Sequence, residues 1–198
     1  MHPNGQFHWA DDDAMLAAIN GMPFGRIFAT TPMGPRVAHA PVIVTPQRTL
    51  RFHLANGNAL TDCLDGAVAL ILFEGANSYI SANWNGPPSH SVPTWNYVAI
   101  ECEGTVRKLG SDDLVALLDT LAQQLEPTVD EDWTRAKMDP ARFEAMLHAI
   151  TCFELDITAI RGTRKLSQNK SQKDHIMITS ALDQIGHSAM AQLMRDAV

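Results

Sequence analysis

Short β-prone runs separated by turn residues constrain the fold of this chain more than any other feature. Three such runs follow one another early in the sequence, with turn signals at Met33-Gly34-Pro35 and Pro46-Gln47-Arg48. Close spacing of this kind predicts consecutive antiparallel strands. The strand–helix alternation of a parallel doubly wound sheet is not sustained, which disfavours a Rossmann fold. The strands predicted here are 25–31, 36–45 and 49–54.

The rest of the pattern adds strands and a few helices. A continuous apolar run at 67–74 is typical of a strand buried on both faces, and a turn at 75–77 is expected to lead into a strand at 79–82. A leucine stripe with helical spacing predicts core packing; it comprises Leu114, Leu117, Leu118, Leu121 and Leu125. Further strands are expected at 95–108 and 152–160. Helices are expected from 11 to about 20 and at 58–65, 111–125, 140–148 and 171–197, the last interrupted near Gly186. A loop is expected at 83–91 and a linker at 126–138. Together, these elements indicate a mainly β chain of the α+β class. We expect a closed or nearly closed antiparallel barrel decorated with helices.

Composition excludes several classes of protein. The chain has 198 residues, 45% of them hydrophobic and 19% charged, as expected of a packed globule. A net charge of −7 argues against a protein that coats nucleic acid or an anionic membrane. The longest apolar run, 67–73, is too short to span a bilayer. No secretory signal is recognisable, and three widely spaced cysteines form no Cys-x-x-Cys pair, so we expect reduced thiols, a cytoplasmic location and no metal site.

Three segments are polar and aromatic where core residues would be expected. They are 79–84, 92–97 and 165–169. Flat rings beside amide and hydroxyl groups suit a planar heterocycle, although an aromatic core with capped loops would give the same composition. Five basic residues, with no acid among them, surround the third segment: Arg161, Arg164, Lys165, Lys170 and Lys173. Such a patch suits a phosphorylated ligand or a nucleic-acid backbone, and a solvated face is the alternative.

The motifs in these segments resemble those of the FMN-binding negative transcriptional regulators, the PaiB-like family. The most specific strings are Val92-Pro93-Thr94-Trp95-Asn96-Tyr97 and Lys165-Leu166-Ser167-Gln168-Asn169. Weaker marks are Met1-His2-Pro3 with Phe7, Pro23-Phe24, His39-Ala40-Pro41, His53-Leu54-Ala55 with Asn58, Tyr79-Ile80-Ser81 with Trp84, and Phe153-Glu154 with Ile157. The resemblance covers residues 1 to about 169.

This resemblance implies a split β-barrel that dimerises and holds FMN in clefts at the subunit interface. We expect one domain over 1–170 and a helical tail, 171–198, packed on it. The residues it places near the flavin are His39, Pro41, His53, Ala55, Asn58, Tyr79, Ser81, Trp95, Asn96, Tyr97, Lys165, Ser167 and Gln168.

One departure from the family pattern bears on the cofactor. Relatives place Arg after His-x-Ala, whereas this chain has Asn56. If that Arg holds the phosphate in relatives, FMN binding here is expected to be weak or absent, unless Arg51, Arg164 or Lys165 compensates. A charge-assisted hydrogen bond is worth about 1.5–3 kcal/mol.

Three functions remain open at this point. The first is an FMN-binding transcriptional regulator. Its partner would be DNA, although the overall negative charge does not support DNA binding. The second is a flavin-dependent oxidoreductase, with no identified catalytic residue beyond His39 and His53 as candidate proton donors. The third is a carrier of FMN or haem.

Overall fold

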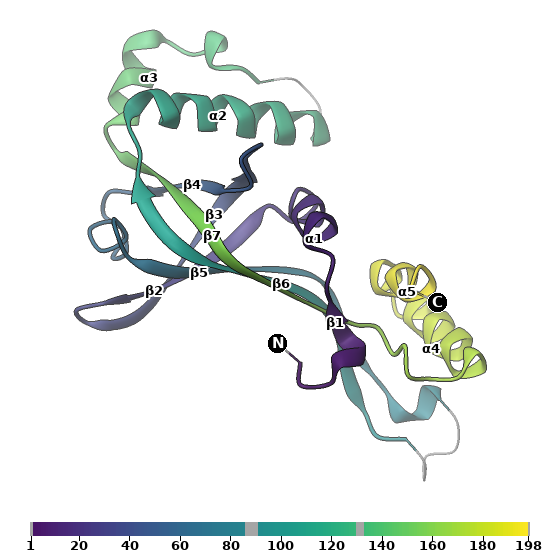
Figure 1. The fold of residues 1–198 in the computed structure, drawn as a ribbon. Coiled ribbons are helices and arrows are strands. Elements are labelled where there is room, and N and C mark those ends of the chain that lie inside the picture. Colours follow the sequence, from purple (N-terminus) through teal and green to yellow (C-terminus); the bar gives the residue numbers. More distant parts are fainter. Residues whose placement is uncertain (1, 86–90, 130–132, 198) are drawn as a thin grey trace. The chain divides into compact units, whose positions relative to one another are not determined.

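The structure is a computed structural model and describes residues 2–85, 91–129 and 133–197. The expected loop at 83–91 and linker at 126–138 therefore lie partly outside the described residues, as does Met1 of the first motif. The strands are β1 (His8–Trp9), β2 (Phe24–Thr31), β3 (Gly34–Val44), β4 (Leu50–Ala55), β5 (Val68–Ile80), β6 (Thr94–Lys108) and β7 (Ile150–Lys165). The α-helices are α1 (Asp12–Ile19), α2 (Ser111–Leu125), α3 (Pro140–Leu147), α4 (Gln172–Gln184) and α5 (Ser188–Arg195) (Figure 1).

Strand pairing closes a barrel. The sheet runs β1-β7-β4-β3-β2-β5-β6, and β7 pairs with β6 as well. The extra pairing joins the two ends of the order from β7 to β6, so that six strands form a ring, and β1 pairs with β7 outside it. This confirms the expected mainly β split-barrel architecture with helical decoration.

Alternation along the strands fills the ring with apolar side chains. On β4 the residues Leu50, Phe52 and Leu54 are buried, and on β5 the same holds for Ala69, Ile71 and Phe73. Residues between them face outward. Phe52 and Phe153 stack with their ring centroids 5.7 Å apart. The period-2 pattern in the sequence is therefore the pattern of the core.

The β6 strand approaches β7 closely at Gly104. A Cβ built on this residue would lie 2.0 Å from the backbone oxygen of Asp156 and 2.8 Å from a methyl group of Leu155. Backbone atoms cannot move aside as a flexible side chain can, so only glycine fits at this crossing.

The α2 helix covers the outer face of β3 and β4. Its residues Leu114, Leu117 and Leu121 are buried against Ile43 and Cys152, with Leu118 and Leu125 packed beside them. The predicted leucine stripe is confirmed as core. The helix begins after Gly110, and no side chain caps its first turn.

The chain divides into two compact units. The barrel unit comprises 16–73 and 101–160, and the second unit comprises 1–15, 74–100 and 161–198. Strands β5, β6 and β7 run from one into the other. In the second unit, α4 and α5 pack together after a turn at Gly186, where φ is +81°.

Three local predictions were wrong. Residues 58–65 form turns instead of a helix. The predicted turn at 75–77 does not exist, because β5 continues unbroken to Ile80. The β5 run is also not buried on both faces: Val68 is exposed and Leu70 and Leu72 are half-buried, because their side chains face out of the barrel.

No helix among the described residues is long and apolar enough to cross a membrane. The three cysteines are free thiols; Cys102 and Cys152 are buried and Cys63 is half-buried.

Candidate functional site

In the second unit, two neighbouring cations of β7 lie against aromatic rings. The Arg164 guanidinium carbon is 5.0 Å from the centroid of Trp9, and the Lys165 Nζ is 5.9 Å from that of Phe7. Lys165 Nζ also donates a hydrogen bond of 2.5 Å to Thr94 Oγ1. We call Phe7, Trp9, Thr94, Arg164 and Lys165 the cation–aromatic cluster. It places two positive charges, on opposite faces of β7, beside neutral partners.

Gly162 allows β1 to lie against β7 beside this cluster. A Cβ on Gly162 would lie 2.5 Å from Met15 Sδ and 2.8 Å from Trp9 Cβ. Trp9 pairs with Gly162 in the β1–β7 ladder. The missing side chain therefore leaves the room that Trp9 occupies.

A buried polar network supports the segment that follows Lys165. The Asn96 amide nitrogen donates to Ser167 Oγ at 2.9 Å, and both side chains are buried. Ser167 has a φ of +62°, a conformation that the bond to Asn96 helps to hold. His175 of α4 contacts the Leu166 carbonyl oxygen at 3.1 Å through Nε2. The Gln168 side chain accepts from the Leu166 backbone N–H and donates to the Arg164 carbonyl oxygen.

The Asn96 and Ser167 side chains are therefore positioning groups rather than exposed ones. Both were predicted near the flavin, yet their polar atoms bond to each other inside the second unit. Asn96 Nδ2 also lies 3.4 Å from the Met194 Sδ of α5. Helices α4 and α5 thus contact the segment 166–168 and its hydrogen-bond partner Asn96.

The aromatic residues of β5 and β6 form a separate exposed group. Tyr79 and Trp95 meet edge to face with ring centroids 6.1 Å apart, and both are about half exposed (49% and 51%). Trp95 Nε1 donates to Asn77 Oδ1 at 3.1 Å. Because side chains alternate along a strand, Trp95 and Tyr97 face away from Thr94 and Asn96. Trp95 and Tyr97 therefore lie on the opposite face of β6 from Thr94, the hydrogen-bond partner of Lys165.

Ser81 follows the β5 strand and caps a short turn. Its side chain accepts a hydrogen bond from the Asn83 backbone N–H, at the start of the 3₁₀ turn Ala82–Trp84. This contact explains the Ser-Ala-Asn string without a ligand.

In the barrel unit, the predicted residues of β3 and β4 share the outer face. Ile43 pairs with Arg51, and alternation places His39 and Pro41 with Ile43, and His53 and Ala55 with Arg51. His39 stacks on the exposed ring of Phe24, with centroids 5.9 Å apart. Four of the predicted residues are therefore gathered on one surface of the barrel.

The side chains of Asn56 and Asn58 make hydrogen bonds that hold the loop after β4. Asn58 Oδ1 accepts from the Leu60 backbone N–H at 3.0 Å. Asn56 Nδ2 donates to the His148 carbonyl oxygen at 2.7 Å, and its Oδ1 accepts from Thr151 Oγ1 at 2.8 Å. Asn56, which replaces the arginine of the family pattern, thus fastens this loop to the start of β7.

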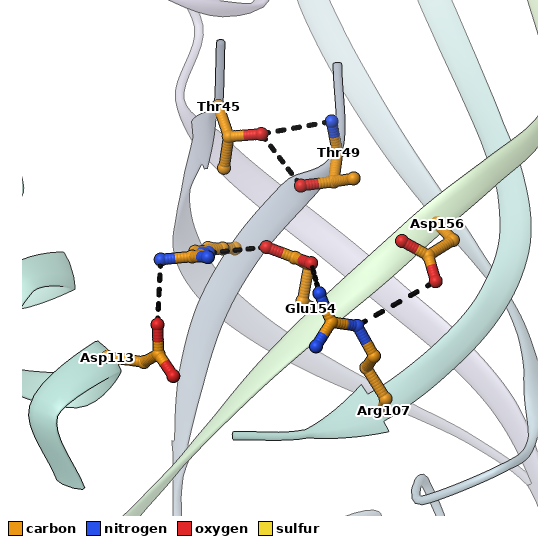
Figure 2. A network of polar contacts seen from close by, with 7 residues as sticks. Thr45, Thr49, Arg107, Asp113, Glu154 and Asp156 are labelled. Atoms are coloured by element: carbon orange, nitrogen blue, oxygen red, sulfur yellow. Dashed lines mark hydrogen bonds and ion pairs between the residues drawn. The ribbon is translucent and has the colours of Figure 1, made fainter. Parts of the chain in front are cut away.

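A charge network occupies the outer face of β4 and β7, and sequence reasoning missed it (Figure 2). The Glu154 carboxylate is buried and accepts hydrogen bonds from Arg51 and Arg107, one on each oxygen. Arg51 also reaches Asp113 of α2 at 3.2 Å, and Arg107 lies 3.8 Å from Asp156. The Phe153-Glu154 string was the only signal: an acid placed between buried residues of a strand.

The network fixes the ionisation of its members. Burial opposes the charge on Glu154, but hydrogen bonds from Arg51 and Thr49 and the charges of both arginines outweigh it, so the pKa of Glu154 is lowered. The pKa of Arg51 is raised, chiefly by its hydrogen bond to Glu154. Arg51 is consequently engaged by two carboxylates.

His53 lies on the same face, two pairing positions from Arg51, and lines a cavity of about 490 Å³. Its Nδ1 atom is buried and has no hydrogen-bond partner among the described residues. Burial lowers the pKa of His53, so the ring is neutral at pH 7. The neighbouring Cys152 pairs with it in the ladder, and burial raises the pKa of that thiol to about 12.

Comparison with known proteins identifies the family. Residues 1–159 match the family model described as "Putative FMN-binding domain". The chain belongs to this family. The chain is also 28% identical over 183 residues to the "Protease synthase and sporulation protein PAI 2" of Bacillus subtilis, a match that covers 87% of this chain and 86% of that protein. This confirms the resemblance drawn from the Val-Pro-Thr-Trp-Asn-Tyr and Lys-Leu-Ser-Gln-Asn strings.

Solved structures confirm the fold of this FMN-binding-domain protein. The flavocytochrome Anf3 from Azotobacter vinelandii superposes with a TM-score of 0.67 at 10% identity, covering 89% of this chain and 78% of that one. The FAD and heme binding protein from Mycobacterium smegmatis gives 0.59 at 13% identity, covering 80% and 73%. At these identities the likeness is one of fold.

Proposed function

We propose that this chain binds FMN as a homodimer and works as a PaiB-like transcriptional regulator. Membership of the FMN-binding domain family supports the flavin. The observation that carries FMN, rather than a flavin without a phosphate, is the cation–aromatic cluster. There, Arg164 and Lys165 stand beside rings and a hydroxyl instead of carboxylates.

A phosphate requires cations that are not already neutralised. Several arginines of this chain have carboxylate partners: Arg51 and Arg107 share Glu154, Arg135 pairs with Asp119, and Arg195 with Asp183. Lys165 differs because Thr94 and Phe7, which it contacts, are uncharged. A phosphate that joins Lys165 gains a charge-assisted hydrogen bond without displacing an acid.

The flavin ring requires flat apolar surface. The chain offers it in two places, each described within its own unit: the half-exposed pair Tyr79 and Trp95, and the stacked pair Phe24 and His39 of the barrel. When bound, the isoalloxazine would supply electron-transfer chemistry. The residues of this chain would hold its ring and its phosphate.

The homodimer is supported by apolar surface on the outside of the barrel. Phe28 pairs with Val37 and with Leu70, so these side chains lie next to each other on one outer face. Phe24, Val37 and Val68 on β2, β3 and β5 are 57%, 45% and 65% exposed. Exposed apolar side chains grouped on a sheet are unfavourable in water, and a second copy of the same chain would cover them.

The FMN assignment is tested by comparing FMN with riboflavin. Lys165→Ala should weaken FMN binding about tenfold or more in isothermal titration, equivalent to about 1.4 kcal/mol, and leave riboflavin nearly unchanged. Lys173→Ala is the matched control, because Lys173 is an exposed lysine of α4. Equal losses for FMN and riboflavin would contradict the assignment of the phosphate to Lys165.

The homodimer is tested by placing a charge among the exposed apolar side chains of β2, β3 and β5. Val37→Glu should convert a dimer into a monomer in sedimentation velocity at micromolar concentration, while Arg36→Glu, a change at the adjacent position of β3, should not. A wild-type chain that sediments as a monomer with FMN bound would overturn the homodimer. The regulatory role is tested separately, by a gel shift on the promoter region of the chain's own gene with and without FMN.

A further inference from the structure

The turn that follows Lys165 is held in a strained conformation within the second unit. Ser167 has a φ of +62°, which residues other than glycine rarely adopt, and such a backbone persists only where surrounding contacts determine it. Inside the turn, the Gln168 side chain accepts from the Leu166 backbone N–H at 2.8 Å, and the Lys170 N–H donates to the Ser167 carbonyl oxygen at 3.0 Å. Because Lys165 directly precedes this turn, the contacts that hold the turn also fix the point from which the lysine side chain extends.

His175 of α4 adds a contact from outside the turn. Leu166 is fully buried, and its carbonyl oxygen lies 3.1 Å from His175 Nε2. A carbonyl oxygen only accepts hydrogen bonds, so Nε2 carries the hydrogen of this imidazole ring. Loss of this donor would cost a buried carbonyl its hydrogen bond, which is unfavourable. The contact therefore fastens α4 to the turn.

The first turn of α4 fixes the His175 ring. Ser171 caps the helix by accepting from the Asp174 backbone N–H, and the His175 N–H donates to the Ser171 carbonyl oxygen at 2.9 Å. The carbonyl oxygen of His175 accepts from Thr179 Oγ1 at 3.0 Å, and the residue is almost fully buried. The ring thus has a defined position from which it acts on Leu166.

Two hydrogen bonds connect the turn and Lys165 to the same face of β6. Asn96 bonds to Ser167, and Thr94 accepts from Lys165 Nζ. Thr94 and Asn96 are two residues apart on the strand, so their side chains point to one face. A displacement of the turn would therefore strain the contact at Ser167 and move Lys165 away from Thr94.

We propose that His175 is a positioning residue for the phosphate of FMN: its hydrogen bond to Leu166 holds the turn and thereby keeps Lys165 in place. The inference rests on the proposed function, in which Lys165 binds that phosphate. It makes α4 part of the FMN site, although this helix lies outside residues 1–159, which match the family model. Because linkage is reciprocal, a phosphate bound at Lys165 also stabilises the docking of α4.

Isothermal titration of the full chain with FMN and riboflavin tests the proposal. His175→Phe keeps a ring but removes the donor, and it should weaken FMN binding about tenfold, the upper end for one net hydrogen bond. The affinity for riboflavin, which has no phosphate, should stay nearly unchanged. His175→Gln, which retains an N–H donor at the ε position, should restore most of the FMN affinity.

His187→Phe is the matched control. It removes another histidine contact of the helical tail, the 2.7 Å contact of His187 Nδ1 with Ser78 Oγ, and leaves the bond to Leu166 in place. FMN affinity should then stay near that of the wild type. A loss as large as that of His175→Phe would overturn the positioning role, as would an unchanged FMN affinity in His175→Phe or equal losses of FMN and riboflavin affinity in that variant.

Hydrogen exchange on the unmodified chain decides the question if a variant does not fold. Saturating FMN should slow the exchange of the α4 backbone amides, and saturating riboflavin should not. Equal slowing by both flavins, or no slowing by FMN, would overturn the proposal.

Lys165→Ala separates this inference from the proposed function. If Lys165→Ala weakens FMN binding and His175→Phe does not, only the positioning role of His175 fails. If Lys165→Ala leaves FMN binding unchanged, or if the wild-type chain binds neither flavin, both fail.

Discussion

Arg51 and His53 are next neighbours on the outer face of β4, yet their surroundings are opposite. Arg51 pairs in the ladder with Glu154, and its charge is fully engaged by that carboxylate and by Asp113. His53 pairs with Cys152, and its buried Nδ1 lacks a partner within the described residues. One strand thus presents a closed polar site and an open apolar one side by side.

The cover supplied by α2 explains the difference. The first turn of the helix brings Asp113 over Arg51, whereas later turns bring Leu118, Leu121 and Ala122 over His53. An acid near a helix N-terminus is also favoured by the helix dipole. The strand residues alone therefore do not decide which position is closed and which borders a cavity; the helix placed above them does.

Breaking the closed site should have the largest effect. Glu154→Gln leaves Arg51 and Arg107 without their shared charge and should lower the free energy of unfolding by about 2 kcal/mol, less than for a fully buried pair because both arginines reach solvent. Urea denaturation measures this loss. Asp156→Asn is the control, since its exposed carboxylate lies 3.8 Å from Arg107 and should change stability by less than about 0.5 kcal/mol. Equal losses in the two variants would show that burial of Glu154 contributes nothing.

The Glu154 and His53 sites should lose their contributions to stability in different pH ranges. The folded-state pKa of Glu154 is below its ordinary value of 4.5, so its stabilisation is complete above that pH and is lost as the pH falls through the folded pKa. The stability gap between wild type and Glu154→Gln should therefore close only below about pH 4.5.

His53 should act in a higher pH window. Its folded-state pKa lies below the ordinary 6.5, so under pH 6.5 the unfolded chain takes up a proton that the folded chain does not. Wild type should then lose stability relative to His53→Phe between pH 6.5 and 4.5, where Glu154 is still ionised. Urea midpoints measured across pH 4–8 give both curves; parallel curves for wild type and His53→Phe would contradict the burial of a neutral ring.

A smaller effect is expected at the loop just beyond the open site. Asn56→Arg removes the contacts to His148 and Thr151 and should lower stability by about 1 kcal/mol, because the residue is exposed and a net hydrogen bond is modest. If relatives hold the phosphate with this arginine, FMN affinity should rise about tenfold and fall again at high salt. Isothermal titration with FMN and riboflavin decides this; an unchanged FMN affinity would place the phosphate elsewhere.

The smallest effect should come from filling the open site. Ala122→Phe places a ring in the cavity and should raise the unfolding free energy by about 0.5–1 kcal/mol, as cavity-filling changes commonly do. The thermal midpoint is the measurement. A clear loss of stability would mean that the cavity cannot accept a side chain from α2.

The sequence predicted the barrel because strand periodicity and turn residues are local signals. The meander at 25–54 and the leucine stripe of α2 were found in this way. The unbroken course of β5 was not, because Gly75 and Asn77 resemble turn residues although strand pairing overrides that preference. Residues 58–65 have the composition of a helix yet form turns, held partly by Asn58.

The candidate site was predicted from the composition of three segments and from motifs. These signals predicted Lys165, His39 and His53 as site residues. They did not show which side chains point inward: Asn96 and Ser167 bond to each other, and Glu154 binds two arginines that come from different strands. Such partners are distant in sequence, so no local pattern reveals them. The cavity was missed for the same reason, because helices that follow β6 complete its walls.

The position of β7 in the chain has a consequence for synthesis on the ribosome. It is the last strand made, and it pairs with β1, β4 and β6. The ring therefore stays open until residue 165 has left the exit tunnel, and Trp9 waits for Gly162, some 150 residues later. Non-local pairing of this kind is slow and exposes strand edges meanwhile. We expect nascent chains that stop before β7 to depend on chaperones.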